Sequence, residues 1–151
     1  MKLQKGDKAP YFRLKSADET EIALQDLLGK KVVVYFYPKD NTPGCSIEAE
    51  EFSAFIEEFS AKNAVVVVIS PDSPNCHQNF IANKSLKVLL ISDPDKSVAS
   101  AYGAYGTKMM YGKEVQGIIR STFVIAQDGT IEQSFYNVRA KGHAQKVLES
   151  L

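Results

Sequence analysis

One of the two cysteines, Cys45, stands where a thiol can become a reactive thiolate. It follows the apolar run Val32–Tyr37 and precedes a stretch with helical periodicity. Thr42 has the side chain of a helix N-cap and Pro43 suits the first helical position, so Cys45 is predicted to be the third residue of that helix. Unpaired backbone N–H groups and the helix dipole favour the anion there, so we expect the thiol pKa to lie below the free value of about 8.5.

The neighbours of Cys45 argue against an inert, buried cysteine. Free cysteines are commonly packed in protein cores, and this is the ordinary interpretation of a single cysteine. Residues 40–44, however, read Asp-Asn-Thr-Pro-Gly, a polar and turn-forming stretch that is unusual around a core cysteine. We therefore interpret Cys45 as a functional thiol.

The residues around Cys45 also resemble a known pattern. The spacing Pro-x-x-x-Thr-x-x-Cys, carried by Pro38, Thr42 and Cys45, resembles the active-site signature of the peroxiredoxins. The longer phrase Y-F-Y-P-K-D-N-T-P-G-C-S-I-E-A resembles the bacterioferritin-comigratory-protein branch, also called the Q type. Three further phrases match that branch in the same order: G-D-K-A-P-Y-F-R-L, I-S-P-D-S and G-I-I-R-S-T-F-V-I. The resemblance thus covers nearly the whole chain.

The resemblance implies a bacterial thiol-dependent peroxidase that acts in antioxidant defence. In such an enzyme Cys45 would reduce hydrogen peroxide or an organic hydroperoxide and become a sulfenic acid, which thioredoxin or another thiol would recycle. The resemblance implies no cofactor and no metal, and it implies a monomer or at most a weak dimer. The chemistry needs a thiolate, donors that hold the peroxide in line, and a positive charge where negative charge accumulates.

Four further residues are candidates for this site. Thr42 stands three residues before Cys45, so its hydroxyl can face the thiol across one turn, and Pro38 would shape and shield the pocket wall. Arg120 alone would be interpreted as an arginine at a strand entrance with its charge in water. The resemblance instead implies an arginine at this place beside the peroxidatic sulfur. Glu48 is either a partner that orients this arginine or a solvated residue of the helix.

The second cysteine, Cys76, is a candidate resolving cysteine. Many relatives carry the resolving residue five positions after the peroxidatic one, where this chain has Glu50, and others carry it in the helix after the next strand. Cys76 lies near the start of that helix. A disulfide with Cys45 requires Cα atoms within about 7 Å, so a helix start would have to unwind locally. The alternative is a bystander Cys76 and a one-cysteine cycle.

Bulk composition indicates one soluble domain, residues 1–151, and excludes several classes of partner. The chain has 151 residues, and its eighteen basic side chains balance eighteen acidic ones, so we expect no nucleic-acid partner. The N-terminus lacks the apolar stretch of a secretory signal and no run is long enough to span a membrane, which predicts a cytoplasmic protein without a membrane partner. Two cysteines in such a protein favour redox chemistry over a structural disulfide.

The apolar pattern predicts an α/β fold. Two β-branched runs, Val32–Tyr37 and Val65–Ile69, read as central parallel strands, and Val88–Ser92 reads as a third. Other predicted elements are a hairpin of 12–15 and 21–24, a helical turn at 25–28, a crossover helix with Ala49, Phe52, Ile56 and Phe59 in the core, a helix from Ser73-Pro74 to about Asn83, a short helix at 98–102, a hairpin of 122–126 and 131–136, and a closing helix after Gly142. This order resembles the thioredoxin-like fold, a central mixed β-sheet flanked by helices with an N-terminal β-hairpin.

Two other functions stay open at this stage. A thioredoxin-like binding or chaperone module would keep the fold without turnover, and a cysteine hydrolase would pair Cys45 with a histidine base. The two histidines, His77 and His143, form no zinc pattern and are predicted to lie on the surface. The glycine-containing stretch 102–112 matches no nucleotide-binding motif, and we interpret it as a loop near the substrate entrance.

Overall fold

The structure is a computed structural model that describes residues 3–16, 19–27, 29–37, 43–84, 86, 88–110, 112–136 and 142–151. For residues 43–48, 75, 83, 84, 108–110 and 115 it describes the backbone alone.

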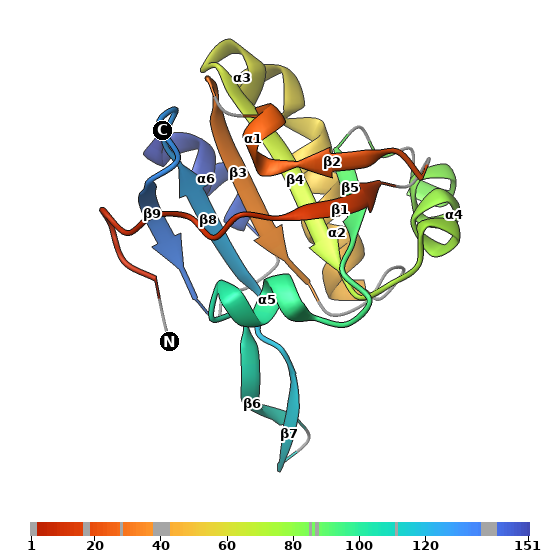
Figure 1. Cartoon of the computed structure of the whole chain (residues 1–151). Helices are drawn as coiled ribbons and strands as arrows, with labels where there is room; N and C mark the ends of the chain where they lie inside the picture. Colours follow the sequence, from red (N-terminus) through yellow and green to blue (C-terminus); the bar gives the residue numbers. More distant parts are fainter. Residues whose placement is uncertain are drawn as a thin grey trace.

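A seven-stranded mixed sheet with the strand order β2-β1-β5-β4-β3-β8-β9 forms the centre of the protein (Figure 1). The three middle strands, β3, β4 and β5, are parallel, and the others pair antiparallel to their neighbours. The strands are β1 (Arg13–Ser16), β2 (Glu21–Ala23), β3 (Lys31–Phe36), β4 (Ala64–Ser70), β5 (Leu89–Ser92), β8 (Ser121–Ile125) and β9 (Ile131–Phe135). The predicted α/β fold with a mixed sheet and an N-terminal hairpin is confirmed, with strand ends shifted by about one residue.

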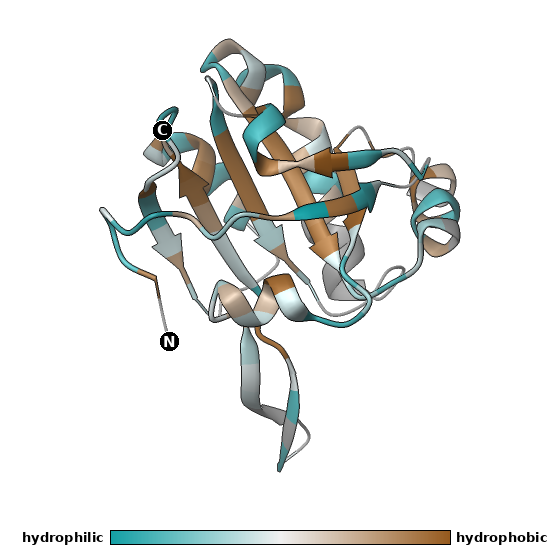
Figure 2. Ribbon diagram, viewed as in Figure 1, coloured by the Kyte–Doolittle hydropathy of each residue, from teal (hydrophilic) through white to brown (hydrophobic). Residues whose placement is uncertain are grey.

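Both faces of the central strands are buried, as their continuous apolar sequences predicted. Alternate residues of β3 point to opposite sides because side chains along a strand alternate. Val34 and Phe36 contribute to the core on one face, whereas Val33 and Tyr35 contribute to the core on the other. The brown strands at the centre of Figure 2 are these apolar rows.

Helices cover the two faces unequally. One face carries α2 (Pro43–Ala54), α3 (Ile56–Ala61), α4 (Pro74–Lys84) and α6 (His143–Ser150), and the other carries α1 (Leu24–Leu27) and α5 (Ser97–Ala101) (Figure 1). The first group buries Phe52, Phe59 and Phe80 against the sheet, and the second buries Leu24 and Val98. The sheet is therefore enclosed between two helical layers.

The predicted crossover helix consists of two helices rather than one. α2 ends at Ala54 and α3 begins at Ile56, with Phe55 between them. The aromatic stripe is core, as predicted, because Phe52 stacks on Tyr35 with ring centroids 4.8 Å apart and also lies against Phe59.

The stretch predicted as a loop, residues 102–112, is instead largely a β-hairpin. β6 (Tyr105–Met110) pairs antiparallel with β7 (Lys113–Ile118) and projects away from the sheet (Figure 1). Gly112 has a φ of 78°, which a glycine adopts without strain at a turn. The loop prediction was wrong because the two strands satisfy each other's backbone groups and need no continuous apolar pattern to do so.

Candidate active site

Cys45 is the third residue of α2, as the sequence predicted, because α2 begins at Pro43. The helix follows β3, a central strand that is buried from Val32 to Phe36. Pro38 and Thr42 lie outside the described residues, and so do the side chains of Cys45 and Glu48. The backbone of α2 therefore fixes where the thiol is carried, and the roles of these four side chains stay predictions.

Arg120 lies directly before β8, at the strand entrance that the sequence predicted. β8 is the antiparallel neighbour of β3, and their register pairs Phe36 with Ser121. Arg120, the residue before Ser121, thus lies beside the carboxyl end of β3, where the chain continues toward Cys45. The pairing of β3 with β8 brings a half-buried cation to the edge of the sheet that carries the cysteine.

His143 is buried at the start of α6, so its predicted surface position was wrong. Its Nε2 atom lies 2.7 Å from Thr122 Oγ1, within hydrogen-bond distance. The edges of the imidazole ring also contact Phe52 and Phe135. A histidine can be buried when its apolar ring packs and its polar edge has a partner. No local sequence pattern indicated that Thr122, 21 residues away, would be that partner.

The environment of His143 keeps its imidazole neutral near pH 7. Burial, which is the largest cause, and the cations of Lys146 and Arg120 together lower the pKa of His143 to about 4. Arg120, directly before β8, is thus one of the two cations that act on this histidine at the start of α6. A neutral imidazole there adds no second positive charge beside Arg120.

Glu51 fixes the orientation of α2 against α6. Its carboxylate accepts the backbone N–H of Gly142, with N···O distances of 2.8 and 3.2 Å to the two oxygens. Phe52, the next residue, packs on His143. The helix that carries Cys45 is therefore held by a charged hydrogen bond and by an aromatic contact, both about two turns beyond the cysteine.

His77 is also buried, which corrects the second prediction of a surface histidine. Its Nδ1 atom lies 3.5 Å from the hydroxyl of Tyr37, and both residues are fully buried. Tyr37 directly follows β3, and His77 directly follows Cys76 in the first turn of α4. This contact connects the end of β3 to the helix that carries the second cysteine.

Cys76 is an exposed free thiol at the third position of α4. The helix begins at Pro74, and the backbone N–H of Cys76 donates to Ser73 Oγ at 3.2 Å, so Ser73 caps the helix. β3 and β4 are parallel neighbours whose register pairs Phe36 with Ile69. The helices that carry the two cysteines therefore start from the same edge of the sheet.

Comparison with known proteins identifies the class to which this fold belongs. The family model described as AhpC/TSA family matches residues 5–134. A Helicobacter pylori (strain J99) protein named as a peroxiredoxin, bcp, is 63% identical over 150 residues, which cover 99% of each chain. Peroxiredoxin Bcp of Bacillus subtilis (strain 168) is 38% identical and is matched over 100% of this chain and 96% of its own.

Solved structures agree with the sequence relatives. A mutant of Xylella fastidiosa PrxQ superimposes with a TM-score of 0.93 at 35% identity and covers 99% of this chain and 96% of its own. The bacterioferritin comigratory protein of Xanthomonas campestris, whose structure concerns alkyl peroxide reduction, has a TM-score of 0.87 at 37% identity over 92% of this chain and 88% of its own.

The chain has a thioredoxin-like peroxiredoxin fold and belongs to the AhpC/TSA family. It is a peroxiredoxin of the Bcp or Q type, a thiol-dependent peroxidase whose substrates are a peroxide and a thiol reductant. The comparisons therefore favour the peroxidase over the two alternatives that the sequence alone left open, the binding module and the cysteine hydrolase. None of the described helices has the length and apolar character that a membrane span requires.

The buried state of His143 predicts a specific dependence of stability on pH. Its folded pKa is depressed, so the unfolded chain takes up a proton first as the pH falls through about 6.5, and the free energy of unfolding falls until about pH 4. At about pH 4.5 we expect this residue to account for a loss of about 2 kcal/mol relative to neutral pH. The glutamine of His143→Gln can still form a hydrogen bond with Thr122 but does not titrate. The variant should therefore lose about 2 kcal/mol less unfolding free energy than the wild type between neutral pH and about pH 4.5.

Urea unfolding of both proteins at neutral pH and at about pH 4.5 provides the measurement. Other groups titrate equally in the two proteins, so the difference between the two pH effects isolates His143. Equal losses in the wild type and in His143→Gln would show that the imidazole is protonated in the folded protein over the same pH range as in the unfolded chain.

Proposed function

We propose that Cys45 is the peroxidatic nucleophile. Its thiolate attacks one oxygen of the hydroperoxide, a sulfur–oxygen bond forms and the O–O bond breaks. The sulfur loses two electrons and becomes a sulfenic acid, while the departing oxygen takes a proton and leaves as water or an alcohol. The observation that carries the proposal is the place of Cys45 at the third position of α2, after the buried strand β3.

Arg120, Thr42 and Pro38 complete the proposed site. The Arg120 guanidinium stabilises the thiolate and the negative charge that develops on the leaving oxygen, because a fixed cation acts strongly in a partly dehydrated pocket. The Thr42 hydroxyl holds the peroxide in line, and Pro38 forms the wall. Glu48 is proposed to orient Arg120. The support for Arg120 is its position beside the carboxyl end of β3.

We further propose hydrogen peroxide and alkyl hydroperoxides as substrates and thioredoxin as the reductant. Alkyl peroxide reduction is the subject of the related Xanthomonas campestris structure, and thioredoxin dependence is typical of the family. The enzyme is proposed to work in the cytoplasm, where cysteines are kept reduced, as a monomer or at most a weak dimer.

Replacement of each cysteine tests the assignment of the nucleophile. Cys45→Ser should abolish thiol-dependent consumption of peroxide, because serine cannot form the sulfenic acid. Cys76→Ser is the matched control, and it should retain the first, single-turnover reaction with peroxide at the wild-type rate. Stopped-flow measurement of peroxide loss would refute the assignment if Cys45→Ser kept wild-type turnover or if Cys76→Ser alone stopped the first step.

Cys76 is proposed to resolve the sulfenic acid as a disulfide with Cys45. The thiolate of Cys76 attacks the sulfenic sulfur, a sulfur–sulfur bond forms and the sulfur–oxygen bond breaks, and the oxygen leaves as hydroxide, which takes up a proton to become water. The support is geometric: α2 and α4 leave the same edge of the parallel sheet, and each carries its cysteine at the third position. The first turn of α4 would unwind to bring the sulfurs together, and the Tyr37–His77 contact would have to open.

A thiol count after one equivalent of peroxide tests the resolving step. We expect the wild type to lose both alkylatable thiols and to yield a linked peptide pair by mass spectrometry. Cys76→Ser should instead show a sulfenic or sulfinic acid at Cys45. A wild-type protein that keeps one alkylatable thiol at Cys76, with no linked peptides, would establish a one-cysteine cycle.

A further inference from the structure

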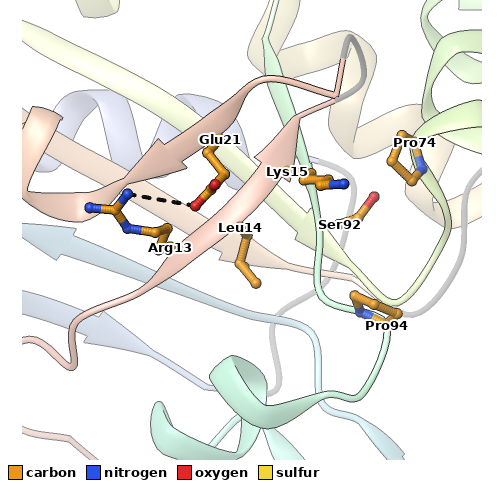
Figure 3. Close-up of a pocket in the computed structure, with 7 residues that line it drawn as sticks. All are labelled: Arg13, Leu14, Lys15, Glu21, Pro74, Ser92 and Pro94. Carbon is orange, nitrogen blue, oxygen red and sulfur yellow. Dashed lines mark ion pairs between the residues drawn. The ribbon is translucent and has the colours of Figure 1, made fainter.

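A pocket of about 310 Å³ lies where β1 separates from β5, beside the first residue of α4 (Figure 3). The ladder between β1 and β5 is short and pairs Lys15 with Ser92 and Ser16 with Ile91. After Ser92 the chain turns away through Pro94, which has no N–H to continue a ladder. The two strands diverge from this point, and the space between them is the pocket.

Most of the pocket wall is apolar. Leu14 from β1, Pro94 after β5 and Pro74 at the start of α4 line it. A pocket of this volume is at the small end of the range for ligand sites, about 300–1,000 Å³, so it suits a molecule of a few carbon atoms. Its walls would bury an alkyl chain.

The hydroxyl of Ser92 lies at the polar end of the pocket. Ser92 is 4% exposed, and its buried hydroxyl makes no hydrogen bond within the described part of the chain. A buried hydroxyl without a partner is destabilising, and a ligand acceptor would relieve this cost. Lys15 lies directly opposite Ser92 in the ladder, and Figure 3 shows its side chain extending toward Ser92.

The charges around the pocket favour an anion. Arg13 and Glu21 form an ion pair at its rim, with an N···O distance of 3.6 Å, and both side chains are exposed. Lys15 also lines the pocket and forms no ion pair with any residue that the structure describes. One ammonium group therefore stands beside the Ser92 hydroxyl at the end of an apolar pocket.

We propose that this pocket binds a small carboxylic acid with a short alkyl chain. The carboxylate accepts a hydrogen bond from Ser92 and forms an ion pair with Lys15. The alkyl chain lies against Leu14, Pro74 and Pro94. Both polar groups and all three apolar walls are thereby used by one ligand.

Occupancy of the pocket has a consequence for Cys76 that rests on the proposed resolving role. Pro74 is the first residue of α4 and Cys76 the third, so the ligand contacts the turn that would unwind before the disulfide forms. A ligand that binds only the folded turn stabilises it by mass action. The bound carboxylate therefore slows disulfide formation and lengthens the life of the sulfenic acid at Cys45.

Titration with hexanoate, followed by backbone amide NMR, tests the site directly. We expect saturable shifts at Leu14 and Ser92, no comparable shifts with hexylamine, and weaker binding of hexanol. Lys15→Gln and Ser92→Ala should each weaken hexanoate binding by about tenfold, as loss of one charge-assisted or neutral hydrogen bond in a buried site does. Lys113→Gln, which removes an exposed cation from β7, is the matched control and should leave binding unchanged.

The site is refuted if hexanoate gives no saturable shifts, if hexanol or hexylamine binds equally well, or if Lys113→Gln weakens binding as much as Lys15→Gln. The rate of disulfide formation with and without hexanoate, at about three times its wild-type Kd, tests the coupling. It should fall in the wild type and fall much less in Lys15→Gln, and an unchanged wild-type rate overturns the coupling. A protein without any peroxide reaction would refute the proposed function and leave the binding result standing.

Discussion

The burial of β3 from Val32 to Phe36 is the constraint on which the rest of the structure depends. Its residues from Val32 to Phe36 are inaccessible to solvent on both faces, with β4 on one side and β8 on the other. A shift of one residue in either ladder would turn every side chain to the opposite face, so the register is strongly fixed. The end of β3 consequently has a fixed position relative to the start of α4 and to Arg120. The edge of the sheet where Cys45 is carried is set by core packing.

The helices at this edge are held to different degrees. α2 is anchored by the hydrogen bond between Glu51 and Gly142 and by the packing of Phe52 on the sheet and on His143. α4 is anchored in its first turn by the Ser73 cap and the long contact between His77 and Tyr37, while Cys76 itself is exposed. Cys76 itself loses no buried contact when this turn opens, and the contact that must break is the one between His77 and Tyr37. An anchored α2 beside an exposed Cys76 is the arrangement from which we propose a two-cysteine cycle.

The sequence predicted what depends on local pattern. Apolar runs predicted the central strands. The pattern of an N-cap residue followed by proline predicted that Cys45 is the third residue of α2 and that Cys76 lies in the first turn of α4. Burial of the two histidines depends on tertiary partners, Thr122 and Tyr37, that are distant in the chain and leave no periodic signal. The β6–β7 hairpin and the pocket beside Ser92 likewise arise from how strands meet or diverge. Tertiary pairing therefore explains most of what the sequence did not predict.

The pKa of the Cys45 thiol tests the central claim, that the start of α2 and the nearby Arg120 together make this cysteine reactive. In Cys76→Ser it is the only cysteine, so the rate of alkylation by iodoacetamide against pH reports its thiolate fraction. We expect a midpoint well below the free value of about 8.5, and a higher midpoint when Arg120→Ala is added to the same background. A midpoint at or above about 8.5 that Arg120→Ala leaves unchanged would contradict it.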